Sequence, residues 1–317
     1  TQSITGVGFQ PDWVWVKCRN DGKHHSIYDS VRGVTKYISS NLNTAEQTNS
    51  GGVTAFDADG FSVGNFGDVN ASFNFASWNW KAGTTSGLSG GTITPSAYSI
   101  NATAGFGIYK YTGNSTSGAT IAHGLGKVPT WIMVKRLDAS PEWQIYHQAM
   151  GNNKWIEFTT GTPQTGTSRW NDTSPTSTLF YLGNDSDVNN SSGTYVAYVF
   201  CDVTGFSKMG DYVGNANTNG AFIYTGFKPT WIMIKGISAS NRNWNIIDNK
   251  RDTFNPSGDF LQGNTANTED TSSIDMDFLS NGFKFNVTSA RVNAAETYIY
   301  MAFAEHPFVG NDSGTAV

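Results

Sequence analysis

The sequence predicts an all-β protein built as three tandem antiparallel β-sandwich modules of jelly-roll-like type, and three observations support that prediction. First, one proline–tryptophan–lysine motif occurs three times in the same register. Second, the 317 residues include 20 Phe, 13 Tyr and 10 Trp but only eight Leu, and aromatic residues favour strands whereas leucine favours helices. Third, no apolar stripe with helical spacing runs for more than about three turns.

The repeated motif defines the domain organisation. Its copies read Pro11-Asp12-Trp13-Val14-Trp15-Val16-Lys17, Pro129-Thr130-Trp131-Ile132-Met133-Val134-Lys135 and Pro229-Thr230-Trp231-Ile232-Met233-Ile234-Lys235. Modules of roughly 100 residues have the usual size of a two-sheet sandwich. We expect module one at 1–83, a linker rich in Gly, Ser and Thr at 84–105, module two at 106–205, module three at 206–310 and a tail at 311–317.

Each module is expected to contain the same series of core strands. The repeated motif forms the first strand, and turn-forming residues bound each apolar run. A second strand follows at 25–29, 143–147 and 244–248, and an aromatic strand closes each module at 75–80, 195–200 and 300–304. A lead-in strand precedes copies two and three, around Tyr111 and Tyr212, but not copy one, so we expect the chain to be a fragment of a longer protein.

Tryptophans at repeated positions are expected to share one task, which is packing. Trp13, Trp131 and Trp231 are therefore predicted to be buried. The two cysteines, Cys18 and Cys201, lie at non-equivalent positions of their modules. A structural disulfide would be expected at repeating positions, so both are interpreted as packed residues or free thiols.

Composition excludes several classes of partner. Charged residues make up 14% of the chain and the formal net charge is −5. We expect no nucleic-acid binding, because that function requires clustered Lys and Arg. We also expect no membrane insertion, because no stretch approaches the ~20 apolar residues of a membrane-spanning helix.

The search for catalytic motifs predicts that the protein is not an enzyme and needs no cofactor. The chain has no Gly-x-Ser-x-Gly elbow, no His-Glu-x-x-His motif and no phosphate-binding loop. His147 is a single-copy exception, since Asp29 and Asp248 stand at its equivalent positions. It is interpreted as a structural residue, although one active copy among three remains an alternative.

Paired carboxylates are the only candidate metal ligands. Asp57 with Asp59, Asp185 with Asp187, and Asp275 with Asp277 are two residues apart, which places each pair on one face of a strand. Calcium prefers such oxygen ligands, so the calcium candidates are Asp57, Asp59, Asp185 and Asp187, but the spacing does not match a known calcium loop. The expectation is that no metal is bound and that these are polar turn residues. Paired carboxylates also suit glycoside hydrolysis.

A ligand-binding site is predicted in module two. Trp155 and Trp170 are tryptophans that the repeat does not explain, and Trp170 lies in a stretch rich in Thr, Ser and Asn, with Arg169 and Asp172 nearby. Aromatic faces stack on sugar rings, so these four residues are the candidate carbohydrate-binding group. The alternative is that both tryptophans only pack.

Several short motifs resemble a known protein family. They are Val31-Arg32-Gly33, Phe56-Asp57-Ala58-Asp59-Gly60-Phe61, Trp78-Asn79-Trp80-Lys81-Ala82-Gly83, His123-Gly124-Leu125-Gly126, Gly205-Phe206-Ser207-Lys208, Asp277-Phe278-Leu279-Ser280-Asn281-Gly282-Phe283-Lys284 and the closing Tyr300-Met301-Ala302-Phe303-Ala304-Glu305-His306-Pro307-Phe308. Together they resemble a repeat module of tail-fibre and tail-associated proteins of marine bacteriophages, over nearly the whole chain. The family pattern has cysteine where this chain has Asn79.

The resemblance implies a location on the virion surface, outside the cell, and other virion proteins as partners. It also implies a homotrimer in the native fibre. The function we expect is that of an adhesin segment that contacts host cell-surface glycans. One alternative is a purely structural decoration or fibre-shaft protein without a ligand, and another is a glycan depolymerase. Exposed aromatic residues peculiar to one copy favour adhesion, uniform module surfaces favour a structural part, and a cleft with two carboxylates favours an enzyme.

Overall fold

The computed structural model describes residues 1–304, and almost all of its regular structure is antiparallel β-sheet. The predicted all-β sandwich class is confirmed. The predicted tail at 311–317 and the last four residues of the closing motif lie outside the described residues. The chain forms two compact units. The first comprises 1–158 and 164–201, which hold module one and most of module two. The second comprises residues 202–304, which hold module three, together with the short segment 159–163 of module two.

Module one has two small sheets around a shared core. The repeated motif forms the central strand of the first sheet, because its apolar residues alternate between two covered faces. This sheet has the order β3 (Ser26–Asp29), β2 (Trp13–Cys18), β8 (Phe75–Trp80). The second sheet has the order β1 (Gln2–Thr5), β7 (Gly60–Val63), β6 (Val53–Asp57), and β4 (Lys36–Tyr37) pairs with β5 (Gln47–Thr48).

Module two repeats this plan with a larger first sheet. Its order is β13 (Gln144–His147), β12 (Trp131–Arg136), β17 (Thr194–Phe200), β10 (Phe106–Thr112), β9 (Ala97–Asn101). Two further pairs are β11 (Ala119–Ala122) with β16 (Leu179–Leu182), and β14 (Lys154–Trp155) with β15 (Gln164–Thr165). A 3₁₀ turn, η1 (Gln148–Met150), and a one-turn helix, α1 (Ser186–Asn189), complete the module.

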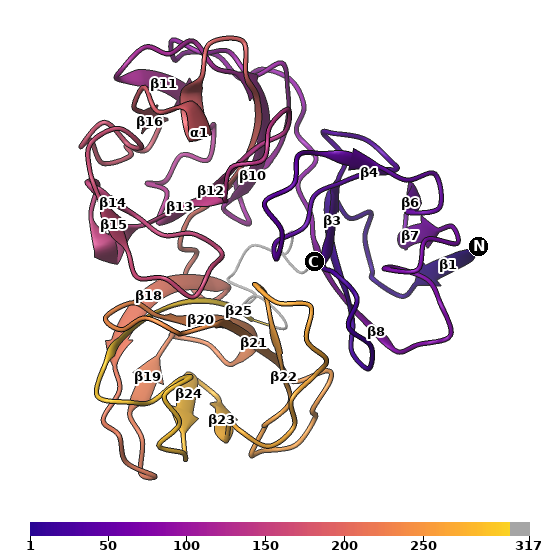
Figure 1. Cartoon of the computed structure of the whole chain (residues 1–317), viewed down its shortest axis with the longest axis vertical. Coiled ribbons are helices and arrows are strands. Elements are labelled where there is room, and N and C mark those ends of the chain that lie inside the picture. Colours follow the sequence, from indigo (N-terminus) through magenta and orange to yellow (C-terminus); the bar gives the residue numbers. More distant parts are fainter. Residues whose placement is uncertain (305–317) are drawn as a thin grey trace, which may run out of the picture. The chain divides into compact units, whose positions relative to one another are not determined.

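Module three places a five-stranded sheet against a three-stranded one, as the orange-to-yellow part of Figure 1 shows. The larger sheet has the order β18 (Ser207–Val213), β25 (Thr297–Ala304), β20 (Pro229–Gly236), β21 (Trp244–Asp248), β22 (Phe260–Gln262). The smaller has the order β19 (Phe222–Tyr224), β24 (Gly282–Phe285), β23 (Met276–Leu279). Between them lies an apolar core that includes Ile232, Phe283 and Tyr300.

The recurring tryptophans are buried as predicted, with exposed fractions of 1% for Trp13, 0% for Trp131 and 5% for Trp231. In module one, however, the covering residues come from outside the sandwich core. The ring of Trp13 lies 5.0 Å from that of Tyr198 and 5.9 Å from that of Phe200, both in module two. Trp13 therefore stabilises the contact between modules one and two rather than the interior of module one.

The 84–105 segment was predicted to be a linker, and that prediction is wrong. Residues 97–101 form strand β9, which pairs with β10 along its length. Ile93 and Ile100 are each only 5% exposed and belong to the core of module two. Few apolar residues occur in this segment, but they stand where the chain touches the core. Gly91, with φ of +80°, allows the close approach, because a Cβ there would lie 2.8 Å from Thr120 O.

Modules one and two interlock through the loop at residues 39–46. Trp143 Nε1 donates to Ser39 O at 2.9 Å, and Glu46 N donates to Leu137 O at 2.9 Å. Lys135 Nζ donates to Asn43 O at 2.9 Å. This explains why the two modules form one compact unit. No helix in the part of the chain that the structure describes is long and apolar enough to cross a membrane.

Candidate functional site

The predicted aromatic site in module two does not present a stacking face. Trp170 is 2% exposed and Trp155 is 7% exposed. Trp170 Nε1 donates to Lys154 O at 3.0 Å, and its ring meets the ring of Tyr146 edge-on at 6.0 Å. A sugar has no access to either ring face in this arrangement, so the interpretation of these two residues as stacking surfaces is wrong and packing is their role.

Arg169 holds this region together instead of facing a ligand. It is 9% exposed, and its guanidinium lies over the ring of Trp155 at 4.7 Å. Its Nε donates to Gln144 Oε1 at 2.8 Å, and it forms ion pairs with Asp185 and with Asp187, the latter at 2.9 Å. Asp172 lies apart on an exposed turn with φ of +48°. The four predicted residues therefore do not form one binding group.

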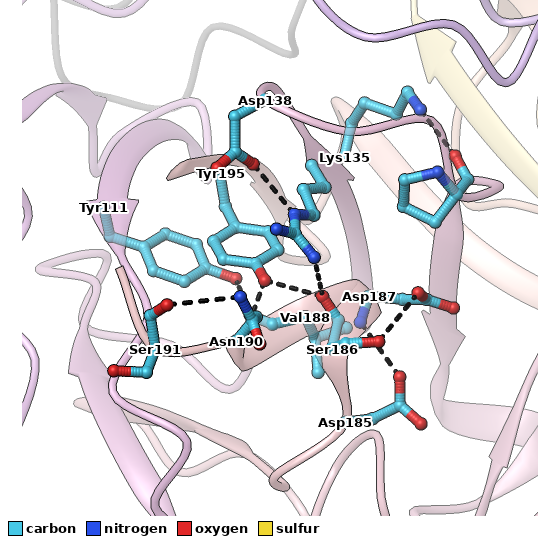
Figure 2. A network of polar contacts seen from close by, with 12 residues as sticks. Tyr111, Lys135, Asp138, Asp185, Ser186, Asp187, Val188, Asn190, Ser191 and Tyr195 are labelled. Carbon is cyan, nitrogen blue, oxygen red and sulfur yellow. Dashed lines mark hydrogen bonds and ion pairs between the residues drawn. The ribbon is translucent and has the colours of Figure 1, made fainter. Parts of the chain in front are cut away.

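Asp185 and Asp187 do meet, but at a helix start rather than on a strand. Asp185 caps α1, and its Oδ1 accepts a hydrogen bond from Asp187 N at 2.9 Å (Figure 2). Burial raises the pKa of the Asp187 carboxyl, while the charge of Arg169 opposes that shift. The guanidinium of Arg169 supplies the positive charge that the two carboxylates need, so they are better explained as an ion-pair network than as calcium ligands.

Asp57 and Asp59 serve different contacts. Asp57 Oδ2 accepts a hydrogen bond from the Ser62 hydroxyl at 2.7 Å. Asp59 accepts backbone bonds from Gly8 N at 2.6 Å and Gly6 N at 3.0 Å, and these bonds lower the pKa of its carboxyl. Among residues 1–304, no group of three or more His, Cys, Asp or Glu side chains is placed to hold a metal ion.

Figure 2 also shows a pair of stacked tyrosines that recurs at the equivalent positions of module three. Tyr111 and Tyr195 stack at 5.1 Å, and their hydroxyls donate to Val188 O and Ser186 O, each at 2.7 Å. In module three, Tyr212 and Tyr298 stack at 5.0 Å, and Tyr212 OH donates to Val292 O at 2.6 Å. Because the same arrangement holds the same turn in two copies, we assign it to structure.

The buried lysine of each motif is also structural. Lys17, Lys135 and Lys235 are 0% exposed. Lys235 Nζ donates to Thr159 O at 3.0 Å and to Arg242 O. Desolvation lowers the pKa of Lys235 to about 7 and that of Lys135 to about 8. Backbone carbonyls accept hydrogen bonds from these amino groups, and desolvation by burial is the main cause of the lowered pKa values.

Module three exposes an aromatic pair at the edge of its smaller sheet. Phe222 and Tyr224 on β19 are 46% and 63% exposed, while Ile223 between them is 5% exposed. Alternate residues of a strand point to the same face, so the two rings lie together on the outer side of the sheet. Opposite Tyr224 is Gly282, where a Cβ would lie 2.9 Å from Phe222 Cε2. The glycine leaves room for the Phe222 ring to lie across the sheet.

A row of polar side chains continues this face beside the rings. Lys284 is directly opposite Phe222, and Asp277 is directly opposite Lys284. Lys284 Nζ donates to Asn286 Oδ1 at 3.2 Å. Asn286 Nδ2 in turn donates to Asp277 Oδ2 at 2.9 Å and to Asp275 Oδ1 at 3.3 Å. We call these residues, with Phe222 and Tyr224, the β19 face.

The β19 face differs from its counterparts in the other modules. In module one, Ser3 and Thr5 of β1 take the places of the two aromatic residues, opposite Ser62 and Gly60. In module two the residues equivalent to Phe222 and Tyr224 are Thr120 and Ala122, and both are buried. There the preceding chain covers the strand, since Thr92 N donates to Thr120 O at 2.9 Å. The exposed aromatic pair is thus a property of one copy.

The sequence did not point to this face as long as only tryptophans were considered as stacking residues. The local sequence pattern nevertheless indicates an exposed apolar strand. The run Phe222-Ile223-Tyr224 is apolar at three successive strand positions, whereas a strand with one solvent face alternates apolar and polar residues.

The fold is an all-β array of sandwich modules in tandem. The exposed aromatic residues that distinguish module three from the other two modules lie on an open sheet surface, the β19 face. The sequence profile of one protein family matches residues 1–307, and the chain belongs to that family, which is described as "Domain of unknown function (DUF7483)". The match spans all three repeats, so the family is defined by the array rather than by a single module. No curated protein and no solved structure matched the chain.

Proposed function

We propose that this chain is an adhesive segment of a bacteriophage virion-surface structure of the tail-fibre type, and that it contacts host cell-surface glycans through the β19 face of module three. The observation that carries the proposal is the exposed pair Phe222 and Tyr224, which the other two copies lack. An aromatic pair retained for folding alone would be expected in every copy and would be buried.

The chemistry of the face suits a sugar chain. Two ring faces give apolar contact for the C–H faces of successive sugars, and the Tyr224 hydroxyl adds a polar end. Lys284 supplies donors to sugar hydroxyls, and Asp275 and Asp277 supply acceptors. The hydrogen bonds to Asn286 order this row before any ligand arrives, which reduces the entropy lost on binding.

Affinity at one such site is expected to be low. An open face without a deep pocket is consistent with a dissociation constant of about 1 mM, or ~4 kcal/mol. Several copies on one particle would raise the overall avidity without new contacts. Assembly with other virion proteins and a homotrimeric fibre remain expectations from the family resemblance, and they would supply those copies.

A purely structural virion component is the second candidate function. The interlock of modules one and two favours it, since the 39–46 loop and the Trp13 contacts join the two modules through hydrogen bonds and buried rings, as the modules of a fibre shaft must be joined. A depolymerase gains less support. Asp275 and Asp277 accept hydrogen bonds from the same Asn286 amide and stand on an open sheet face, not on opposite sides of a cleft.

A multivalent glycan array tests the proposal. The full chain, multimerised on a carrier, is compared with the double variant Phe222→Ser/Tyr224→Thr, which installs the module-one residues. A matched control is Val213→Thr, which alters an exposed apolar residue, 65% exposed, on the other sheet. We expect glycan binding by the wild type and the control and at least a tenfold loss in the double variant. Binding by no member of the array, or equal binding by all three proteins, favours the structural alternative.

A further inference from the structure

Module three also contains a small cavity that the β19 face does not include. Its volume is about 130 Å³, roughly ten times the space that one water needs. The residues around it that matter here are Lys228, Asn249, Asp252, Phe254 and Phe278. All five belong to the same compact unit, so the cavity is a feature of module three itself.

The wall of this cavity is a loop fixed at both ends. Asn255 Nδ2 donates to Phe278 O and Asn255 Oδ1 accepts from Phe278 N, each at 3.0 Å, so the side chain imitates a paired strand. Ser257 exchanges two backbone hydrogen bonds with Met276 at 2.7 and 3.1 Å. Asp252 Oδ2 accepts from Gly258 N at 2.8 Å. The loop therefore holds the cavity open without a ligand.

The rim of the cavity carries an apolar side chain that the fold leaves in solvent. Phe254 is 81% exposed, the largest exposed fraction among the large apolar side chains of the described chain. Folding alone gains little from an aromatic ring in that position, because hydrophobic stabilisation requires burial.

These groups match the chemistry of a sugar. Lys228, which is exposed at the cavity, supplies donors to sugar hydroxyl oxygens. Asp252 adds an acceptor, and Phe254 offers a ring face at the rim. We propose that this cavity is a second carbohydrate subsite, which takes one sugar unit of the glycan whose neighbouring units lie on the β19 face. This inference rests on the proposed function.

The chain itself limits the distance between the two sites. Lys228 follows Tyr224 by four residues, so their Cα atoms are at most about 14 Å apart. An oligosaccharide of a few units spans that separation. The loop is specific to module three. There the chain between the paired residues Ile246 and Leu261 is longer than the equivalent chain of module one, which lies between the paired residues Ile27 and Ile38.

The test uses the full chain and free hexoses and N-acetylhexosamines at high concentration, with binding read as saturation transfer to the sugar protons by NMR. Phe254→Ser removes the ring at the rim, and Lys228→Met removes the donor, both at exposed positions. Lys127→Met is the control, since Lys127 is an exposed lysine two residues before the equivalent proline of module two. The variants are compared in the Phe222→Ser/Tyr224→Thr background, which removes the β19 face, and we expect about a tenfold weaker signal in both cavity variants and none of this loss in the control.

The two proposals separate in the same experiment. Transfer that persists in Phe222→Ser/Tyr224→Thr but falls when Lys228→Met or Phe254→Ser is added supports the cavity subsite. Transfer that is lost only with the aromatic pair overturns the subsite and leaves the β19 face in place. Absence of transfer from any sugar to the folded wild-type chain overturns the subsite as well.

Discussion

Buried lysines recur at one position of the repeated motif, and their amino groups face carbonyl oxygens in all three copies. A lysine that is desolvated without a carboxylate partner prefers the neutral form. The folded state therefore binds fewer protons than the unfolded state over the range between the lowered and the ordinary lysine pKa. This gives the protein an unusual dependence of stability on alkaline pH.

The first prediction follows from Lys235, whose pKa falls to about 7 from an ordinary value of 10.5. Below pH 7 the residue is protonated in both states, so its destabilising effect is fully present. From about pH 7 to about pH 10 the unfolded state holds the extra proton, so the free energy of unfolding should rise with pH. Urea denaturation at pH 6.5, 7.5 and 8.5 measures the slope. Lys235→Met should reduce the slope, to which Lys135 also contributes near pH 8, and an unchanged slope in that variant would contradict the assignment.

A second prediction concerns Trp13. Its ring packs against Tyr198 and Phe200, so Trp13→Ala should lower the free energy of unfolding by about 3–5 kcal/mol. Its indole N–H has no acceptor among the described residues. Trp13→Phe should therefore be much milder, because it keeps an aromatic ring and removes the unpaired donor. Equal losses in the two variants would show that ring packing is not the cause.

For single residues, the sequence correctly predicted that the recurring tryptophans are buried, but it incorrectly predicted that the single-copy Trp155 and Trp170 are exposed. Recurrence implies a shared structural task, which Trp13 and Trp131 confirm. Absence from the repeat does not imply exposure. Arg169 covers Trp155, and Tyr146 packs against Trp170. The residues next to each tryptophan in the sequence do not predict these contacts, because each partner comes from another segment of the module.

Individual elements show why the boundaries were harder to predict than the strands. The motif strands, the second strands and the closing aromatic strands all appear where apolar runs predicted them. The 84–105 segment was different, because its composition is that of a loop. Its strand β9 is fixed by pairing with β10 and by a few buried side chains, and composition averages conceal such isolated positions.

The third prediction tests this element. Ile93 is 5% exposed in the core of module two, so Ile93→Ala should reduce the free energy of unfolding by about 2–4 kcal/mol. Ser89→Ala, at an exposed position of the same segment, should change it by no more than about 0.5 kcal/mol. Chemical denaturation of both variants makes the comparison. Similar small effects would restore the linker interpretation.

For the whole molecule, the threefold repetition was readable from the sequence but the partition into compact units was not. Modules one and two share buried contacts, among them the hydrogen bond of 2.6 Å from Tyr198 OH to Asp29 Oδ2. Such contacts depend on how loops of one module meet strands of the next. Repeat spacing carries no information about them.

The fourth prediction is that module two is not an independent folding unit. A chain beginning at residue 84 keeps β9 but loses Trp13 and the 39–46 loop, leaving Trp143, Tyr198 and Phe200 uncovered. It should bind a hydrophobic dye and unfold at lower urea concentration than the full chain. The same fragment with native-like stability and no dye binding would show that modules one and two fold separately.

The position of a bound oligosaccharide tests the central claim most directly. A crystal structure of the full chain, soaked or co-crystallised with a glycan that binds on the array, would locate the sugar. The account predicts sugar rings stacked on Phe222 and Tyr224, with hydroxyls near Lys284 and Asp277. A glycan bound with full occupancy on another module, with the β19 face empty, would contradict it.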